Sequence, residues 1–324
     1  MKLSLEQIKD IAVGIAYASE NDGKISLHRF TKDQEELYRT VSGDFYKKAF
    51  ASAGVRLEFI TDSSSLSMSV SVGYGSSRKY FCHSIFVNGE SYASLNARSN
   101  TGVFSGKWSL PEGENKVAIY FPWSVSSDIL SLELDDGATL VPVKKAHTMI
   151  SFGDSITHGY DASSPELSYA SVIADALDAD SRNKGIGAEI FRPELAALHD
   201  GISPDYITVA YGTNDWSALD QEAFEANCRA FYTALSENYP AAKIFAVTPI
   251  YRKDWLKVSH SRKFYAISEF IHKLSTELPN VTAIEGIGFI PQDLSCFSPD
   301  GVHPNDKGFK YYGEALAEEI KKYL

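Results

Sequence analysis

The sequence predicts two domains of different class, an antiparallel β-sandwich followed by a three-layer α/β/α domain built on a parallel sheet. Residues 1–145 contain short runs in which apolar and polar residues alternate, the pattern of half-buried strands. Residues 146–324 instead contain short β-branched runs separated by stretches of helical periodicity, the pattern of βαβ units. A chain of 324 residues is long enough for two hydrophobic cores. We expect the boundary within residues 141–147.

The first domain begins with a helical pattern over residues 5–18, and strand patterns follow. Leu66–Val72 places apolar residues on one face and serines on the other. Turn signals such as Asn88-Gly89 and Asp136-Gly137 separate the strands. About seven strands, without a helix after residue 50, predict an antiparallel sandwich of jelly-roll type. The expected strands include residues 55–59, 66–72, 84–87, 117–121 and 130–134.

The second domain alternates strand and helix patterns along its whole length. The strand runs are residues 148–152, 207–211, 244–248 and 281–284. The helical stretches are residues 169–177, 222–238, 262–278 and 306–323. Strands connected through helices of this length lie parallel, and the helices cover both faces of their sheet.

Charge excludes some classes of partner. The net charge of -11 argues against nucleic-acid binding, because phosphates attract basic surfaces. Residues 146–324 hold 15 basic and 25 acidic residues, a formal charge of -10, and should accept neutral or cationic substrates. No apolar run approaches the roughly 20 residues that a membrane-spanning helix needs. The sequence gives no indication of oligomeric state.

The N-terminus and the cysteines favour a cytoplasmic location. Glu6, Lys9 and Asp10 stand where a secretory signal would need an unbroken apolar segment. Three cysteines, Cys82, Cys228 and Cys296, are widely separated and form no CxxC pair. We therefore expect reduced thiols, without a disulfide framework or a zinc site.

Three unusual segments follow strands or precede the last helix of the second domain. Residues 153–159 read GDSITHG, residues 212–215 read GTND and residues 300–304 read DGVHP. In an open parallel sheet, ligands bind outside the carboxyl ends of the strands, so these segments are candidates for one site.

These segments contain the groups that nucleophilic catalysis requires. Ser155 is a nucleophile only if a base takes its proton, and a histidine, with a pKa near ~6.5, is the natural base. We predict that His303 is this base. Asp300 can accept a hydrogen bond from the imidazole and so fix its tautomer and orientation.

The three segments, with a fourth at residues 183–188 that reads NKGIGA, resemble the serine, asparagine, Asp-x-x-His and glycine blocks of the SGNH hydrolases, also called GDSL esterases. The resemblance covers about residues 147–324 and implies a flavodoxin-like α/β/α fold. The alternating-strand half is similar to the β-sandwich that precedes the hydrolase domain in some carbohydrate esterases. Thr157 stands where the G-x-S-x-G elbow of α/β-hydrolases has its second glycine, which argues against that fold.

The resemblance also implies an oxyanion hole, a set of hydrogen-bond donors aimed at the oxygen that becomes negative. The expected donors are the backbone N–H of Ser155, a backbone N–H at Gly187 or Ala188, and the side-chain amide of Asn214. Aligning on Asn183 selects Ala188, whereas aligning on the glycine itself selects Gly187. An alanine can serve if its backbone conformation is not restricted to glycine.

Several residues have a structural interpretation beside the functional one. Ser155 could be a helix cap, Asp154 and Asn214 could stabilise turns, and His158 could touch the substrate or act as a substitute base. Aromatic residues near the blocks could stack on sugar rings or pack in the core. They are Tyr160, Tyr211, Trp216 and Trp255.

The sequence therefore predicts a serine esterase whose Ser155 is acylated by a small ester, with an acetylated carbohydrate as the expected substrate. The alternatives are a lysophospholipase or thioesterase, and a carbohydrate-binding protein whose triad is idle. No metal ion and no organic cofactor is expected.

Overall fold

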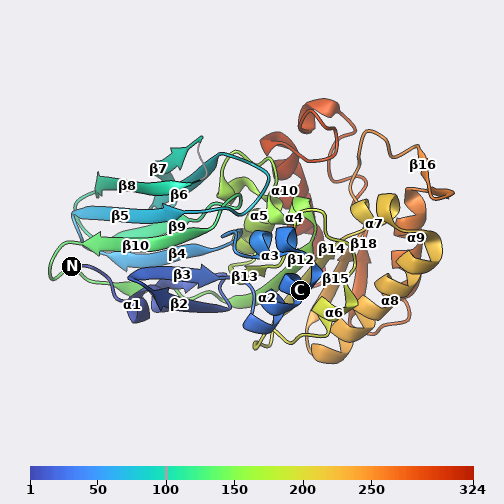
Figure 1. The fold of residues 1–324 in the computed structure, drawn as a ribbon, viewed down its shortest axis with the longest axis horizontal. Helices are drawn as coiled ribbons and strands as arrows, with labels where there is room; N and C mark the ends of the chain where they lie inside the picture. The colour runs from blue at the N-terminus through green and yellow to red at the C-terminus, as the bar shows by residue number, and fades with distance from the viewer. Residues whose placement is uncertain (99–100) are drawn as a thin grey trace. The chain divides into compact units, whose positions relative to one another are not determined.

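The computed structural model describes residues 1–98 and 101–324, which divide into two compact units (Figure 1). One unit comprises Met1–Lys145 with Ser164–Glu166, and the other comprises Ala146–Ser163 with Leu167–Leu324. Within the described residues, no helix combines the length and the apolar character that crossing a membrane requires.

Two antiparallel sheets form the first unit, as the sequence predicts. The first sheet has the order β1-β4-β9-β6-β7, with β11 beside β4, and the second has the order β2-β3-β10-β5-β8. One cluster of buried apolar side chains from both sheets, including Phe59 and Val70, fills the space between them. From β3 to β10 the strand order follows the eight-strand pattern of a jelly roll. The strands are β1 (Ala12–Val13), β2 (Tyr17–Asn21), β3 (Lys24–His28), β4 (Arg56–Thr61), β5 (Ser65–Val72), β6 (Phe81–Val87), β7 (Glu90–Ala97), β8 (Gly102–Ser109), β9 (Asn115–Tyr120), β10 (Ser127–Leu134) and β11 (Val141–Pro142).

The helices of this unit differ from the prediction. The helix expected over residues 5–18 ends at Ile11, so α1 is Leu5–Ile11. The chain then pairs with β4 through Ala12–Val13 and forms β2 from Tyr17, because strand pairing overrides the local helical pattern. Two further helices, α2 (Lys32–Val41) and α3 (Gly43–Ala49), precede the main strands.

The second unit contains a five-stranded parallel sheet in the order β13-β12-β14-β15-β18, the 2-1-3-4-5 order of flavodoxin-like folds. The predicted fold class is confirmed. The strands are β12 (His147–Gly153), β13 (Ala179–Asn183), β14 (Tyr206–Ala210), β15 (Lys243–Val247) and β18 (Val281–Ile284). Strand β13 was not predicted, because this edge strand reads ADSRN and has no apolar run to mark it.

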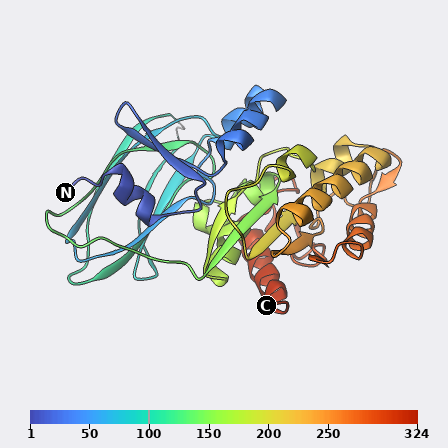
Figure 2. The ribbon, with the colours of Figure 1, turned by 90° about the horizontal axis from the view of Figure 1, so that it is seen from below.

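Helices cover both faces of the parallel sheet, and Figure 2 shows α8 (yellow-orange) and α10 (red) on opposite sides of it. The longer helices are α5 (Tyr169–Ala176), α8 (Gln221–Asn238), α9 (Tyr265–Ser275) and α10 (Asp306–Lys321). Shorter elements are α4 (Ser155–His158), α6 (Pro193–Ala196), α7 (Thr213–Ala218), the 3-10 turns Pro165–Leu167 and Leu294–Cys296, and the hairpin of β16 (Val258–Ser259) and β17 (Arg262–Lys263). Helix α9 starts three residues later than predicted because Arg262 and Lys263 belong to this hairpin.

The turn from β12 into α4 places Ser155 at the carboxyl end of the parallel sheet. The N-cap of α4 is Asp154, whose Oδ1 accepts a hydrogen bond from the backbone N–H of Ile156 at 2.9 Å. Ser155 is therefore the first helical residue and not the cap. Burial raises the pKa of the Asp154 carboxyl to about 7, against the opposing effect of the backbone hydrogen bond from Ile156.

We expect Asp154→Asn to flatten the pH dependence of folding stability. The folded wild type keeps this carboxyl protonated up to a pH of about 7, whereas the unfolded chain releases the proton near pH ~4. Wild-type stability should therefore fall as the pH rises through this window. An asparagine does not titrate and still caps the helix.

The measurement is urea unfolding of both proteins at pH 5 and pH 7.5. The variant should gain about 2 kcal/mol relative to wild type between the two pH values. Equal slopes for the two proteins would show that Asp154 is ionised throughout.

Candidate active site

The candidate catalytic side chains meet at the carboxyl end of the parallel sheet. Ser155 follows β12, Asn214 follows β14, and Asp300 and His303 lie in the loop before α10. His303 Nε2 is 2.7 Å from Ser155 Oγ, although 148 positions separate the residues in the chain. On the other side of the ring, His303 Nδ1 is 2.6 Å from Asp300 Oδ2. One imidazole therefore contacts both the hydroxyl and the carboxylate.

The charge of Asp300 determines which way these hydrogen bonds run. Partial burial acts to raise its pKa, but hydrogen bonds from His303 Nδ1 and from the backbone N–H groups of Val302 and His303 outweigh it. The pKa of Asp300 is lowered as a result, so the group is an ionised acceptor. His303 Nδ1 then carries the proton, and His303 Nε2 can accept a hydrogen bond from the Ser155 hydroxyl.

The loop that holds His303 is fixed by its own backbone. Asp300 Oδ1 accepts hydrogen bonds from the backbone N–H groups of Val302 at 2.9 Å and of His303 at 3.0 Å. Gly301 has φ +66°, in the left-handed region that glycine reaches without strain. Its carbonyl accepts a hydrogen bond from Lys253 N at 2.8 Å, which ties this loop to the segment after β15.

Three residues considered for substrate contact are buried. The centre of the Tyr160 ring lies 5.8 Å from that of His303, with the two rings nearly parallel, and Tyr160 is only 5% exposed. Tyr160 therefore packs against one face of the imidazole. His158 is fully buried, and the nitrogen that faces Ser155 belongs to His303. Trp216 is 3% exposed and donates its indole N–H to the Arg262 carbonyl at 3.1 Å. Burial favours the packing interpretation for these side chains.

The glycine block forms a tight turn beside the nucleophile. Glu189 N donates to Ile186 O at 3.0 Å, which places Gly187 and Ala188 at the centre of the turn. Ala188 has φ +72°, whereas Gly187 has no positive φ, the combination found in a type II turn. Glycine is the usual residue at the second central position, so Ala188 adopts a conformation that costs an alanine about 1 kcal/mol. Gly187 is needed for space, since an added Cβ would lie 2.6 Å from Tyr160 Oη.

The glycine block also packs directly on α4. The side-chain amide of Asn183 donates to the carbonyl of Thr157 at 2.7 Å. A Cβ on Gly185 would lie 2.3 Å from the backbone nitrogen of His158, so only glycine allows this approach. The turn is thereby held at the helix that begins with Ser155.

Asn214 lies in the first turn of α7, next to the glycine turn. Its Nδ2 donates to the carbonyl of Glu189 at 2.9 Å, which leaves the second amide hydrogen for another acceptor. Asp215 holds the start of this helix, accepting hydrogen bonds from Gly212 N at 3.1 Å and Phe191 N at 3.0 Å. The three predicted oxyanion donors thus come from neighbouring turns.

One group of described side chains could hold a metal ion. Ligand atoms of Asp161, Asp300 and His303 lie within 4.8 Å of one another. A cation there would occupy the groups that contact Ser155 and each other, so it would compete with the hydrogen bonds described above. Asp161 was not predicted as a site residue, because nothing in its local sequence pattern marks it.

Residues 151–311 match the family model of the GDSL-like lipase/acylhydrolases. A search of curated protein sequences gave no match. Several solved structures share the fold at low sequence identity.

Three of these structures cover both units. A salicylyl-acyltransferase from a tetracycline biosynthetic pathway superposes with a TM-score of 0.84 at 22% identity, over 96% of this chain and 94% of the other. A family two carbohydrate esterase from Clostridium thermocellum, in complex with cellohexaose, gives 0.67 at 18% identity, over 85% and 94%. An acetyl xylan esterase from the rumen bacterium Butyrivibrio proteoclasticus gives 0.61 at 17% identity, over 85% and 92%.

The fold of the second unit, the order of its motifs and the family match agree with one another. Residues 151–311 therefore form a GDSL-like lipase/acylhydrolase domain, and the chain is an ester-hydrolysing enzyme.

Proposed function

We propose that the enzyme removes acetyl groups from a carbohydrate ester through an acyl-enzyme formed on Ser155. The observation that carries the catalytic part is the pair of contacts made by His303, with Ser155 Oγ at 2.7 Å and with Asp300 Oδ2 at 2.6 Å. The carbohydrate part is supported by the carbohydrate esterases among the structures of the same fold.

In the first half of the reaction, Ser155 Oγ bonds to the ester carbonyl carbon while its proton passes to His303 Nε2. The carbonyl electron pair moves onto oxygen. When the intermediate collapses, the bond to the alcohol oxygen breaks, and the alcohol leaves with the proton from His303. Asp300, as an anion, stabilises the imidazolium that exists between these two proton transfers.

In the second half, water replaces the alcohol. His303 Nε2 removes a proton from water as its oxygen attacks the acyl carbon, and the proton then returns to Ser155 Oγ. Acetate leaves and the resting hydroxyl is restored. No group outside this chain and its substrates is needed to balance either step.

The charge that builds on the carbonyl oxygen needs donors in place before the reaction. We assign this role to the backbone N–H of Ser155, a backbone N–H of the Gly187–Ala188 turn, and Asn214 Nδ2. The hydrogen bond from Asn214 to Glu189 O supports the assignment, because it orients the amide and fixes it against that turn. Such preorganised donors are worth about 3 to 4 kcal/mol each in transition-state stabilisation.

A second candidate function is acyl transfer to an alcohol. The salicylyl-acyltransferase of the same fold favours it, since the same acyl-enzyme can react with an alcohol in place of water. A panel of acetylated sugars, nitrophenyl esters of increasing chain length and a salicylyl ester, each with and without an added alcohol, separates the candidates. Preference for acetylated sugars with water as the acceptor supports the proposal. Preference for long acyl chains, or ester product in place of free acid, would overturn it.

We expect Ser155→Ala and His303→Ala each to lower kcat/KM for p-nitrophenyl acetate by about 10⁴-fold or more. The two losses should be similar, because the hydroxyl and the imidazole act as one unit. Ser203→Ala, at an exposed position of the same unit, is the control and should match wild type.

The same assay separates the open interpretations of this site. A wild type without hydrolysis above buffer would indicate a binding protein with an idle triad. A near-normal rate for His303→Ala, with loss in His158→Ala, would reassign the base.

Asn214→Ala should lower kcat by about 10²- to 10³-fold, because one donor to the developing oxyanion is lost. The Tm should change little, since the side chain is only partly buried. Steady-state kinetics give kcat and thermal unfolding gives the Tm, both measured on the same preparation. A large fall in Tm with nearly normal kcat would instead assign Asn214 to the turn alone.

Substitutions at the two central residues of the glycine turn should have different effects. Gly187→Ala should lower kcat, since the added methyl group meets the Tyr160 hydroxyl and displaces the ring on which His303 stacks. Ala188→Gly should keep its activity, because glycine adopts a φ of +72° more readily than alanine. Kinetics of both variants test this, and loss of activity in Ala188→Gly would show that the alanine side chain is itself required.

A further inference from the structure

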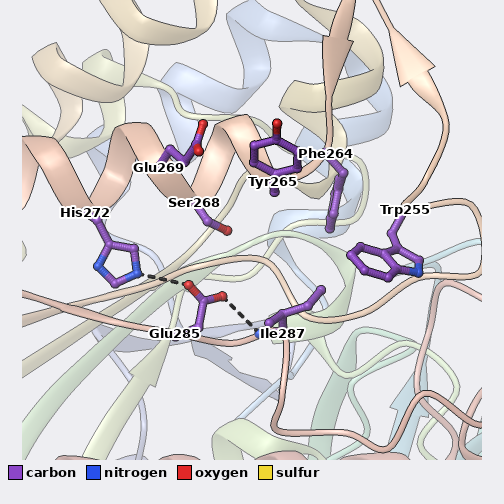
Figure 3. Close-up of a pocket in the computed structure, with 8 residues that line it drawn as sticks. All are labelled: Trp255, Phe264, Tyr265, Ser268, Glu269, His272, Glu285 and Ile287. Carbon is purple, nitrogen blue, oxygen red and sulfur yellow. Dashed lines mark hydrogen bonds and ion pairs between the residues drawn. The ribbon is translucent and has the colours of Figure 1, made fainter.

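A hollow of about 470 Å³ lies in the second unit, outside the candidate catalytic residues (Figure 3). We name it the aromatic pocket, and it is lined chiefly by Trp255, Phe264, Tyr265, Glu269, His272 and Glu285. The loop after β15, helix α9 and the segment after β18 supply these residues. The volume is in the range that holds a small organic molecule.

The pocket has an aromatic side and a side with ionisable groups. Figure 3 shows Trp255 and Phe264 toward one end, with His272 and Glu285 toward the other and Glu269 above them. A ligand that fits must present apolar surface and a polar or charged group together.

The two glutamates of the pocket differ in their hydrogen-bond and ion-pair partners. Glu285 Oε2 lies 3.0 Å from His272 Nε2, and Glu285 Oε1 accepts a hydrogen bond from the Thr248 hydroxyl at 2.8 Å. Glu269 makes no hydrogen bond or ion pair with any residue that the structure describes, and none of the lining residues is lysine or arginine. Glu269 is therefore the one carboxylate of the lining that has no partner among the described residues, and its side chain is exposed to solvent beside the aromatic rings.

Two cations of the chain lie beside the rings of the pocket, and one of them, Arg252, is also paired with Asp254 at 2.6 Å. Lys263 Nζ lies 5.7 Å from the centre of the Tyr265 ring, and the guanidinium of Arg252 lies 5.8 Å from that of Phe264. Both groups border the pocket without lining it. A ring face together with a nearby carboxylate is the combination that binds ammonium groups in proteins.

The lining also contains groups that can hydrogen-bond a neutral, hydroxylated ligand, among them the Glu269 carboxylate and the hydroxyls of Tyr265 and Ser268. A cation differs from such a ligand by the attraction of its positive charge to the Glu269 carboxylate and to the ring faces, so a neutral ligand of the same shape is the necessary comparison.

Contacts link the pocket to the candidate active site on two sides. The Trp255 ring lies 6.2 Å from that of Tyr251, which lies 5.5 Å from Phe297 in the segment leading to Asp300. On the other side, Arg252 next to Phe264 donates to the carbonyl of Thr213 at 3.1 Å, at the start of the helix that carries Asn214.

We propose that the aromatic pocket binds an organic cation, a quaternary ammonium or protonated amine group. Its links to both sides of the site make it a subsite for a charged part of the ester or acceptor. Only this placement rests on the proposed function, because binding of the cation itself does not need hydrolysis.

The test compares two soluble probes of the same shape, choline and 3,3-dimethylbutan-1-ol, which differ by one positive charge. Ligand-observed NMR titration of the wild-type chain should give at least about tenfold tighter binding for choline. Glu269→Gln should remove most of this preference and leave the affinity for the neutral alcohol unchanged. Glu237→Gln is the matched control, since it removes an equal charge from an exposed position on α8 and should not affect binding.

Trp255→Leu should weaken binding of both probes, because the loss is one of aromatic surface. Hydrolysis of p-nitrophenyl acetate, measured in parallel, should be unchanged in the control Glu237→Gln. Absence of this hydrolysis in the wild type would count against the proposed function and leave the cation site standing.

Three results would overturn the cation site. They are equal affinities for the two probes, an equal loss in Glu237→Gln and Glu269→Gln, and Glu269-dependent binding of a neutral methyl glycoside in a protein that does not bind choline.

Discussion

The candidate active site depends on one imidazole that is hydrogen-bonded on both sides. His303 can take a proton from Ser155 only while its other nitrogen keeps one, and the ionised Asp300 is what keeps it there. The surrounding structure restricts this ring in several ways. The Asp300 side chain accepts hydrogen bonds from the backbone of its own loop, and Gly301 supplies the positive φ that the loop needs. Tyr160 packs against one face of the imidazole ring.

The parallel sheet is what brings these groups to one place. Strands β12 and β14 are neighbours whose connections run in opposite directions along the sheet, so a crevice opens at their carboxyl ends. Ser155 and Asn214 follow these two strands. The glycine turn closes the same crevice, because Gly185 and Gly187 lack the side-chain atoms that would separate it from α4 and Tyr160. Small residues therefore set the distance between the nucleophile and the candidate oxyanion donors.

The sequence predicted the parts of the fold that have a strong local pattern. Alternating residues in Leu66–Val72 and the β-branched runs of the parallel strands identified those strands, because burial demands these patterns. The polar edge strand β13 and the short α1 could not be predicted, since pairing with distant strands decides them. Motifs singled out Ser155, Asp300 and His303. The support that Tyr160 gives to His303 has no sequence signature, because an aromatic residue near a motif is equally compatible with packing and with substrate contact.

Two buried carboxyls near the nucleophile show that the site is built at some cost in stability. Burial raises the pKa of Asp154 and of Asp215 to about 7, so near neutral pH both groups are partly ionised in an apolar environment. Their oxygens accept hydrogen bonds from backbone N–H groups at the starts of α4 and α7, the helices that carry Ser155 and Asn214. Asparagine could cap either helix without titrating, but it would present one acceptor oxygen where Asp215 uses two, on Phe191 N and Gly212 N. With both oxygens, the Asp215 carboxylate joins the segment after the glycine turn to the start of α7. These two segments carry two of the candidate oxyanion donors, the N–H of the Gly187–Ala188 turn and Asn214 Nδ2. Burial of the Asp215 carboxyl lowers the stability of the fold, but only a carboxylate can hold both segments in this way.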